Sequence, residues 1–386
     1  MTDELSSIPV VRSTKGNEVG DRQEVRHHGD PGREYRAATT SAAMVDRSHR
    51  TLLVVSGRAP TRMLHGVITG SLPPDLEEDE SGMLRGRMPY STILTPKGKV
   101  VTDLRLARLE NGEEGSLLME LPPQGTTAAL SHLRKYLPPR FAQLSESDDP
   151  LGLLTLLGPG SADLISRELL EGRVSPEELA GLSEGEERIL PQPGTFGIRV
   201  IRNGDVSPLA LDVIAPAPLL SELWRRLEEA GTVPTGTEVW ETLRLEKGRP
   251  SYGVELDEDT LPPEAGIETR AIDHEKGCYT GQEVIVRIRD RGRVNRRLRG
   301  LLLGDAVPPP PGTPIYHPGR DRPSGEVRST AKSPQFGQGI ALAYLRREVE
   351  PPALVRLGSE AGPEVQVRAL DPESGWILNE GDPGAD

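Results

Sequence analysis

Cysteine is nearly absent from this sequence, because Cys278 is the only one among 386 residues. A single thiol excludes an internal disulfide, and it cannot by itself supply the four ligands of a structural zinc site or of a conventional iron–sulfur cluster. Long apolar runs are also missing, so no membrane-spanning helix of about eighteen residues is predicted. The N-terminal stretch is acidic and lacks the apolar core of a secretory signal. These absences favour a reducing compartment, and we expect a cytoplasmic bacterial protein without membrane contact.

Positive charge is in deficit over the whole chain, whose formal net charge is −13. This balance argues against general affinity for nucleic acids or anionic membranes, but it does not exclude a local basic site. Aromatic residues are scarce at 3%, whereas 42 glycines and 36 prolines predict many turns. The length exceeds that of one ordinary hydrophobic core, so two or three domains are expected.

The first part of the chain predicts strands and turns after a polar leader. Residues 1–36 are expected to form a disordered tail. TLLVVSG (51–57) predicts a short strand, and APTRMLHGVITGSL (59–72) predicts a helix that begins at its proline. Residues 91–122 predict hairpins, because alternating apolar residues flank the turn sequences PKG and NG.

Two helices are predicted in the middle of the chain. SPEELAGL (175–182) carries a capping box, with Ser175 as the N-cap. PLLSELWRRLEEAG (218–231) places its leucines and Trp224 on one face, so we expect Trp224 in the core.

The last third changes to short strands separated by glycine and proline turns, which predicts a β-barrel or sandwich. Within it, VIVRIRD and RVNRRLRGLLL are expected to pair as a hairpin around an Arg-Gly turn. The division is therefore a mixed α+β region at 37–275, a loop and β domain at 276–372, and a frayed acidic tail at 373–386.

The stretch KGCYTGQE, at residues 276–283, stands where these two regions meet. A nearby cation such as Lys276 lowers the pKa of a thiol and makes it a nucleophile or a metal ligand. Gly277 and Gly281 permit close approach to the backbone. The stretch also contains Tyr279, Gln282 and Glu283, of which the last two offer an amide and a carboxylate. The alternative is a small buried cysteine in a turn, and the residues alone do not decide between the two.

Arginine dominates the sequence that follows this stretch, and cations outnumber acids between residues 276 and 299. Arg287, Arg289, Arg296 and Arg297 could bind polyglutamate, phosphate or RNA. They could equally form cross-strand pairs with acids elsewhere in the chain. No aromatic residues alternate with them, so stacking of single-stranded bases is not supported.

The stretch resembles the signature K-G-C-[FY]-x-G-Q-E of the YgfZ family of folate-binding proteins, which maintain iron–sulfur clusters. ETLRLEKGRPSYGVELDEDTLPPEAGIE (241–268) resembles a segment shared with the aminomethyltransferase, or T-protein, of glycine cleavage. LTPKGKVVTD is similar to the family's N-terminal glycine hairpin, and GEVRSTAKSPQFGQGIALAYLR to its C-terminal barrel repeat. The resemblance covers about residues 37–372.

The resemblance implies a three-lobed, aminomethyltransferase-like α+β fold with a central tetrahydrofolate pocket and a C-terminal β-barrel. Asp103 matches the carboxylate that faces the folate, Arg244 matches an arginine near it, and Glu246 falls in the same motif. A carboxylate for a pterin and an arginine for a glutamate tail are reasonable charge-assisted partners. One segment departs from the transferase: GTFGIRVIRNGDV (194–206) lacks the tyrosines and glutamates expected there.

Three functions follow from these observations. The first is a tetrahydrofolate-binding accessory protein that supports assembly or repair of [4Fe–4S] enzymes, including those that thiomethylate tRNA, with Cys278 as its reactive group. Its partners would be iron–sulfur client enzymes or assembly proteins. The second is a folate-dependent aminomethyl transferase that uses Asp103, and segment 194–206 counts against it. The third is an RNA-binding module that contacts tRNA through the arginine hairpin.

Overall fold

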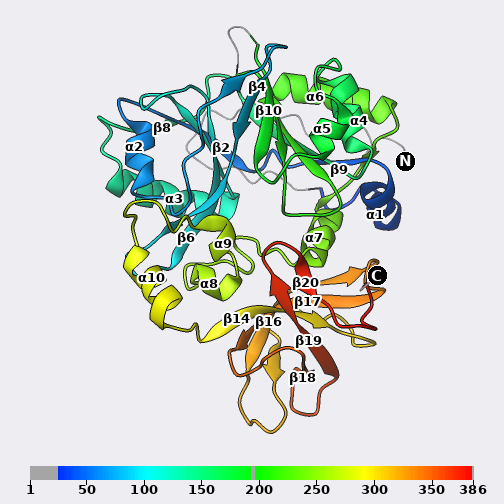
Figure 1. Cartoon of the computed structure of the whole chain (residues 1–386). Coiled ribbons are helices and arrows are strands. Elements are labelled where there is room, and N and C mark those ends of the chain that lie inside the picture. The colour runs from blue at the N-terminus through cyan, green and yellow to red at the C-terminus, as the bar shows by residue number, and fades with distance from the viewer. Residues whose placement is uncertain (1–24, 193–195, 385–386) are drawn as a thin grey trace.

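The computed structural model describes residues 25–192 and 196–384. These residues form three lobes, two of which combine a sheet with helices and make up the body, while the third is a barrel (Figure 1). The predicted α+β architecture with a C-terminal barrel is confirmed.

The first lobe is an eight-stranded sheet in the order β13-β1-β9-β12-β11-β10-β4-β3. Its strands are β13 (Val233–Pro234), β1 (Ala43–Asp46), β9 (Leu151–Leu157), β12 (Ala210–Pro216), β11 (Ile198–Arg202), β10 (Glu186–Leu190), β4 (Leu84–Arg87) and β3 (Glu77–Glu78). Its helices are α4 (Ser161–Glu168), α5 (Pro176–Ala180) and α6 (Ala217–Glu229). Leu156, Val213 and Trp224 belong to one apolar core between sheet and helices, so Trp224 is a core residue as predicted. The Ser175 hydroxyl accepts a hydrogen bond from Glu178 N, which confirms the predicted N-cap.

The second lobe is a five-stranded sheet in the order β5-β6-β7-β2-β8. Its strands are β5 (Tyr90–Leu94), β6 (Val100–Arg108), β7 (Leu117–Leu121), β2 (Thr51–Ser56) and β8 (Gln143–Ser145), and its helices are α2 (Pro60–His65) and α3 (Pro123–Tyr136). The β5–β6 and β6–β7 pairs confirm the predicted hairpins at 91–122. Leu104 of β6 and Leu133 of α3 belong to its core.

The two body sheets meet across a layer of charged side chains. Successive residues of a strand point to opposite faces, so Leu104 joins the helix-covered core while Asp103 and Arg105 lie on the other face of β6. Arg105 Nη2 lies 2.7 Å from Asp212 Oδ2 of β12, which joins the two sheets. Charged groups in this layer are therefore enclosed by both lobes.

The third lobe is a closed barrel, because β14 pairs with both β17 and β19 in the order β14-β17-β16-β15-β18-β19. Its strands are β14 (Arg296–Leu302), β17 (Gln338–Arg346), β16 (Gly325–Ser333), β15 (Pro314–Tyr316), β18 (Ala353–Leu357) and β19 (Glu364–Asp371), with β20 (Gly375–Ile377) paired to β19. Inward-facing residues such as Leu301, Val327 and Val367 fill it.

The remaining helices connect the lobes. They are α1 (Pro31–Thr40), α7 (Thr237–Glu246), α8 (Pro262–Ala265), α9 (Glu268–Ala271) and α10 (Gln282–Arg291). Helix α10 shows that the predicted arginine hairpin is wrong, because VIVRIRD is helical and only RRLRGLL forms a strand. The apolar residues Val284, Ile285 and Ile288 suit a helix face as well as a strand, and Ile285 is buried in the tertiary core.

Both predicted tails are too long. Helix α1 begins at Pro31, with Asp30 as its N-cap and Glu34 buried, so residues 31–36 are structured, while residues 1–24 lie outside the described part. At the other end, Trp376 of β20 is buried and donates from Nε1 to the Leu245 carbonyl at 2.8 Å. Asp382 is ion-paired with Arg368. The expected frayed tail at 373–386 is therefore wrong over its described residues, because an aromatic anchor and a buried ion pair fix it.

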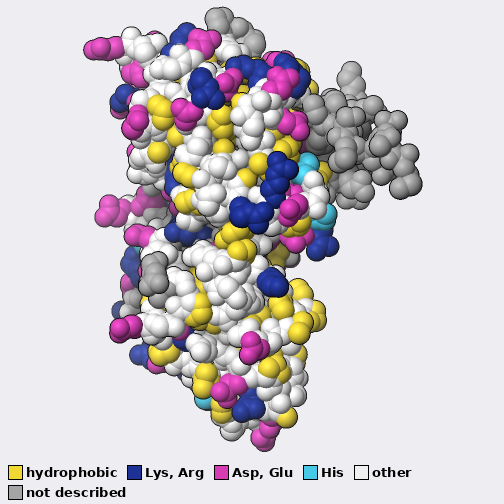
Figure 2. Space-filling model, turned by 90° about the vertical axis from the view of Figure 1, so that its right-hand side faces the viewer, with side chains coloured by type: hydrophobic (Ala, Val, Ile, Leu, Met, Phe, Trp, Pro, Cys, Tyr) yellow, Lys and Arg dark blue, Asp and Glu magenta, His cyan; other side chains and the backbone are white. Residues whose placement is uncertain are grey.

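Charges of both signs are interspersed over the face drawn in Figure 2, rather than gathered into one field. No helix in the described part of the chain is long and apolar enough to cross a membrane.

Candidate functional site

Asp103 lies buried between the body sheets, and the residue is 8% exposed. Its Oδ2 accepts a hydrogen bond from the Tyr90 hydroxyl at 3.0 Å. Its Oδ1 is buried and has no hydrogen-bond partner among the described residues. Burial raises the pKa of the Asp103 carboxyl, although the charge of Arg50 and the bond from Tyr90 oppose the rise. A buried acceptor without a partner is costly to the fold, so a ligand N–H or O–H would be bound favourably there.

Beside Asp103, three arginines and two acids form a network of ion pairs in the layer between the sheets. Arg105 bonds both Glu120 of β7 and Asp212 of β12, and Arg50 bonds Glu120 as well. Arg47 lies 3.3 Å from Asp212 Oδ1 and stacks over the Trp240 ring at 3.9 Å.

Burial alone would raise the pKa of Glu120, but the guanidinium groups of Arg105 and Arg50 outweigh it and lower the pKa to about 2. Glu120 is therefore ionised at neutral pH, and this layer is a fixed charged frame around the Asp103 carboxyl.

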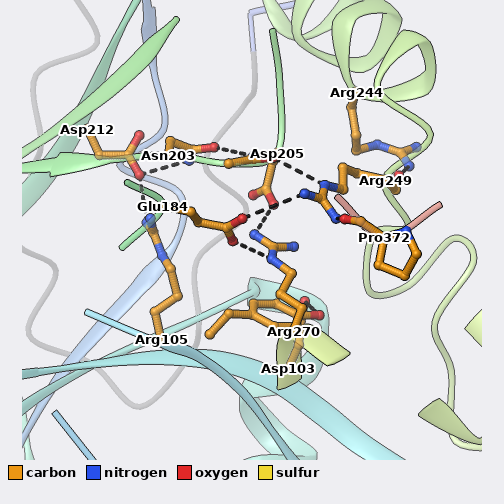
Figure 3. Close-up of polar contacts among 12 residues, drawn as sticks. Asp103, Arg105, Glu184, Asn203, Asp205, Asp212, Arg244, Arg249, Arg270 and Pro372 are labelled. Carbon is orange, nitrogen blue, oxygen red and sulfur yellow. Dashed lines mark hydrogen bonds and ion pairs between the residues drawn. The ribbon is translucent and has the colours of Figure 1, made fainter. Parts of the chain in front are cut away.

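Arg270 of α9 closes the other side of Asp103. Its guanidinium lies over the Tyr90 ring at 4.1 Å, 2.7 Å from Asp205 Oδ1, and it also bonds Glu184 (Figure 3). Burial opposes ionisation of Asp205, but the positive charge of Arg270 holds the pKa of its carboxyl far below the usual range. The ring whose hydroxyl bonds Asp103 is thus fixed from behind by a buried, doubly paired arginine.

Arg244, predicted to lie near a folate, is fully engaged within the protein. Its side chain is 3% exposed, and the guanidinium bonds Glu241 at 2.6 Å, Glu255 at 3.0 Å and the Arg249 carbonyl. With both edges of its planar fork taken, Arg244 holds segment 249–255 against α7, and it has no free edge for a ligand.

Glu246 is likewise engaged by the protein. Its carboxylate accepts hydrogen bonds from the Tyr35 hydroxyl at 2.8 Å, from the Ser333 hydroxyl and from Gln335 N. These contacts join α7 to α1 and to the barrel, so the structure gives Glu246 a place in lobe packing.

Residues 276–281 of the KGCYTGQE stretch form a loop that is docked on residues 66–70. Lys276 Nζ donates to the carbonyls of Ile68 at 2.9 Å and Gly70 at 2.8 Å. Burial lowers the pKa of Lys276 to about 8, and the charge of Asp273 opposes this. Cys278 is exposed, so the alternative of a small buried cysteine is wrong. Lys276 therefore clamps the loop to two backbone carbonyls, and its predicted effect on the thiol stays a prediction.

The second glycine of the stretch is required by the backbone. Gly281 has φ +84°, and a Cβ there would lie 2.6 Å from the Thr95 carbonyl oxygen. Tyr279 is buried beneath the loop, and Gly277 faces the His65 ring. Gln282 begins α10, and Glu283, the next residue of that helix, is exposed. The loop therefore anchors Tyr279 inward and presents the thiol outward.

The four arginines expected to bind an anion do not share one hairpin. Arg287 is exposed on α10, and Arg289 on the same helix is paired with Asp290 at 2.7 Å. Arg296 of β14 is paired with Glu264 at 3.2 Å and lies 4.4 Å from the Tyr344 ring. Arg297 is exposed on the same strand. The predicted contact with tRNA relied on an arginine hairpin, and the structure has a helix and a strand there instead.

Several residues of the central site were missed from the sequence, chiefly Glu120, Asp212, Asp205 and Arg270. A signal for two of them was available, because Glu120 and Asp212 each stand alone in an apolar strand, LLMEL and ALDVIAP. A lone acid in a buried strand must be paired. Arg270 lies in a short helix and gave no such signal.

The segment 194–206, which departs from the transferase pattern, still supplies polar groups to this centre. Residues 194 and 195 lie outside the described part. The remainder forms β11 and the following loop, where Asn203 donates to Asp212 Oδ2 at 2.9 Å and Asp205 pairs with Arg270 (Figure 3).

Comparison with known proteins gives one consistent result. Residues 22–276 match the GCVT N-terminal domain, and residues 296–371 match the glycine cleavage T-protein C-terminal barrel domain. An aminomethyltransferase of Synechococcus elongatus is 31% identical over 344 residues, covering 86% of this chain and 83% of the relative. An aminomethyltransferase of Rubrobacter xylanophilus is 29% identical over 318 residues, covering 82% and 79%.

A solved structure agrees in fold. The glycine cleavage system aminomethyltransferase T from Bartonella henselae superposes with a TM-score of 0.73 and 19% identity, covering 90% of each chain. The three-lobed fold expected from the resemblance is thereby confirmed, whereas a specific match to the YgfZ branch is not among these similarities.

Proposed function

This chain belongs to the glycine cleavage T-protein family, and we propose that it binds a reduced folate at Asp103 and takes part in folate-dependent one-carbon transfer. The observation that carries the proposal is the buried Asp103 carboxyl, whose Oδ1 has no partner in the described structure. The relatives named as aminomethyltransferases support the same reading.

Tetrahydrofolate fits the donor and acceptor groups at this centre. Its pterin carries N–H groups that a buried carboxylate oxygen can accept, and Asp103 Oδ1 is such an acceptor. When bound, the folate would supply the nitrogen that carries the one-carbon unit.

The protein's own contribution is to fix and tune the Asp103 carboxyl. The Tyr90 hydroxyl bonds Oδ2, and Arg270 packs on the Tyr90 ring. These contacts fix the orientation of the Asp103 carboxyl and therefore the position of its unpartnered Oδ1. Because burial raises its pKa, Asp103 can take up or release a proton at Oδ1 at a higher pH than an exposed aspartate. The buried ion pair of Arg105 with Asp212 closes the layer behind it.

Turnover with an aminomethyl donor and tetrahydrofolate tests the proposal. Wild type should transfer the methylene carbon to tetrahydrofolate, giving methylene-tetrahydrofolate, and should release ammonia and the protonated donor group. Asp103→Asn should lower kcat by about a hundredfold or more, because a positioned proton-transfer group contributes that much. Asp148→Asn, the same change on an exposed residue, should leave the rate unchanged. A purified, folded wild type that binds folate but transfers no one-carbon unit would contradict transfer and leave binding.

A second candidate is the accessory role in iron–sulfur enzyme maintenance, and the exposed Cys278 is the observation that favours it. The loop that carries the thiol follows directly from α9, whose Arg270 belongs to the buried centre, and it is held on segment 66–70 by Lys276. One stretch of chain therefore links the proposed folate site to a surface thiol that a client enzyme or assembly protein can reach.

Complementation separates the two candidates. Cells that lack the native protein would be given wild type, Cys278→Ala or Asp103→Asn and scored for tRNA methylthiolation and for a second [4Fe–4S] enzyme. The accessory role predicts that Cys278→Ala fails although the purified variant stays folded and binds folate. Full rescue by Cys278→Ala would remove this candidate and leave one-carbon transfer.

A further inference from the structure

Segment 68–70 lies between β5 and the chain that follows α9. Its N–H groups face β5, because Thr69 N donates to the Thr92 carbonyl at 2.9 Å. Gly70 N donates to the Ser91 hydroxyl at 2.8 Å, and the hydroxyls of Thr69 and Thr92 lie 2.8 Å apart. All of these residues are buried. The segment therefore adds a further layer of polar contacts to β5, the edge strand of the five-stranded sheet.

The carbonyls of the same segment accept hydrogen bonds from the chain that follows α9. Asp273 N donates to the Thr69 carbonyl at 3.0 Å. The Lys276 ammonium donates to the carbonyls on either side, which belong to Ile68 and Gly70. An ammonium has three donors and no acceptor, so one side chain can hold both carbonyls. Three consecutive carbonyls of buried residues thus take their bonds from one short stretch of chain.

The segment also touches the end of α9, the helix that carries Arg270. The Thr69 hydroxyl donates to the Ala271 carbonyl at 2.6 Å. A Cβ added at Gly70 would lie 3.1 Å from the Tyr90 carbonyl oxygen and 3.2 Å from the Ala271 carbonyl oxygen. Strand β5 and helix α9 are therefore packed closely against the same segment.

The two side chains that orient the Asp103 carboxyl stand directly beside these contacts. Tyr90, whose hydroxyl bonds Asp103, precedes Ser91 on β5. Arg270, whose guanidinium lies over the Tyr90 ring, precedes Ala271 on α9. The placement of the ring against the guanidinium therefore depends on the segment that both elements contact.

The charge of Lys276 has few neighbours that could take its place. In the part of the chain that the structure describes, its ammonium bonds the two carbonyls and no carboxylate. The titratable groups around it are Asp273, His65 and Tyr279, whose ring centroid lies 5.9 Å from Nζ. Burial and the charge of Lys276 lower the pKa of His65, and burial raises the pKa of Tyr279. Both of these side chains are therefore uncharged from neutral to mildly alkaline pH, whereas Lys276, with a pKa of about 8, loses its proton there.

We propose that Lys276 is a positioning residue for the Asp103 carboxyl. Its ammonium fixes segment 68–70, and this segment fixes β5 against α9, which carry Tyr90 and Arg270. The loop that presents the exposed thiol would then also support the buried carboxyl. The placement of the two elements does not depend on any ligand, whereas an effect on folate rests on the proposed function.

Hydrogen exchange of the full chain, read by mass spectrometry, tests the positioning without a ligand. The proteins are wild type, Lys276→Met, Lys276→Arg and Lys247→Met. Lys276→Met removes the donors at similar side-chain length, and Lys276→Arg keeps both charge and donors. Lys247 is the matched control, because its Nζ also donates to a backbone carbonyl, that of Glu373 in the C-terminal segment.

In Lys276→Met, amide exchange in peptides of β5 and α9 should become about tenfold faster, because two buried carbonyls lose a donor and the segment loosens. Exchange in barrel strand β17 should stay as in wild type and shows that the chain is folded. Lys276→Arg and Lys247→Met should keep slow exchange in β5 and α9. Faster exchange confined to the loop and segment 68–70, with β5 and α9 as in wild type, would overturn the proposal.

The pH profile of tetrahydrofolate binding gives a second readout, which a merely structural role of the side chain would leave unchanged. As the pH rises from about 7 to about 9, wild type should bind the folate roughly threefold to tenfold less tightly, because charge-assisted bonds become weaker neutral ones. Lys276→Arg stays charged over this range and should lack this loss. Identical profiles for wild type and Lys276→Arg would count against the proposal even if Lys276→Met failed to fold.

The outcomes separate this proposal from the proposed function. If wild type binds no tetrahydrofolate, the proposed function fails, and the exchange of β5 and α9 alone decides the positioning. If wild type binds the folate and a folded Lys276→Met binds it equally well at neutral pH, the proposed function stands and the positioning role of Lys276 is overturned.

Discussion

The charged layer between the body sheets gives a sharp prediction for Glu120→Gln. Glu120 is fully buried and bonds both Arg50 and Arg105. A pKa lowered from 4.5 to about 2 in the folded protein corresponds to about 3 kcal/mol of stability at neutral pH. Removing the charge leaves Arg105 with Asp212, but it takes away the carboxylate that bonds Arg50, which then has only the charge of Asp103 to offset its own. We expect a loss of about 3–5 kcal/mol, the range for breaking a buried pair.

Urea unfolding followed by tryptophan fluorescence measures this loss, and the signal includes Trp240, whose ring lies 3.9 Å from the Arg47 guanidinium of the same layer. Glu222→Gln is the matched control, since Glu222 pairs with Arg225 on the exposed face of α6 and should lose less than about 1 kcal/mol. An equal midpoint for the two variants would refute the reasoning.

The pH dependence of this difference follows from the direction of the Glu120 shift. The folded pKa is lowered, so the unfolded chain binds the proton first and the stabilisation is complete above pH 4.5. It is lost as the pH falls from 4.5 through about 2. The gap between wild type and Glu120→Gln should therefore be constant near neutrality and shrink below pH 4.5.

Two further substitutions test the corrected loop and tail. Gly281→Ala should lower the stability by about 1–3 kcal/mol, because φ is positive and the new Cβ meets the Thr95 carbonyl, whereas Gly266→Ala has positive φ but open space and should cost less. Equal melting temperatures for the two alanine variants would contradict this steric argument. Trp376→Ala should cost about 3–5 kcal/mol in urea unfolding, since Trp376 is buried and its ring packs at a tilt against Phe336, with centroids 5.0 Å apart. Ile377→Ala, at an exposed neighbour, should cost far less. If Trp376→Ala left the free energy of unfolding unchanged, the prediction of a frayed tail at 373–386 would be supported instead.

Much of the fold could be predicted from short-range patterns. The β5–β6–β7 hairpins, the α6 helix and its buried Trp224 each follow from turn residues or apolar spacing within a few positions. The prediction of a strand at VIVRIRD was wrong because its apolar residues suit both the helical and the strand period. Contacts of Ile285 with residues distant in the sequence favour the helix. The prediction of a frayed tail was wrong because Trp376 is held by the carbonyl of Leu245, which lies far away in the sequence.

The candidate site was predicted only in part, for a similar reason. Asp103 was found through a resemblance, but its unpartnered Oδ1 depends on which groups reach it in space. Arg244 was predicted to face a ligand, yet the acids that occupy it, Glu241 and Glu255, lie within the same stretch of sequence. Sequence marks a residue as polar and buried, whereas only the folded structure shows which of its bonds remain unmade.

The central claim is that Asp103 holds a reduced folate, and equilibrium titration of tetrahydrofolate under anaerobic conditions tests it most directly. Wild type and the surface control Asp148→Asn should bind alike. Asp103→Asn should bind about tenfold or more weakly, because it replaces a charge-assisted acceptor with a neutral amide of the same shape. Equal affinities for wild type and Asp103→Asn, with both proteins folded, would contradict the account.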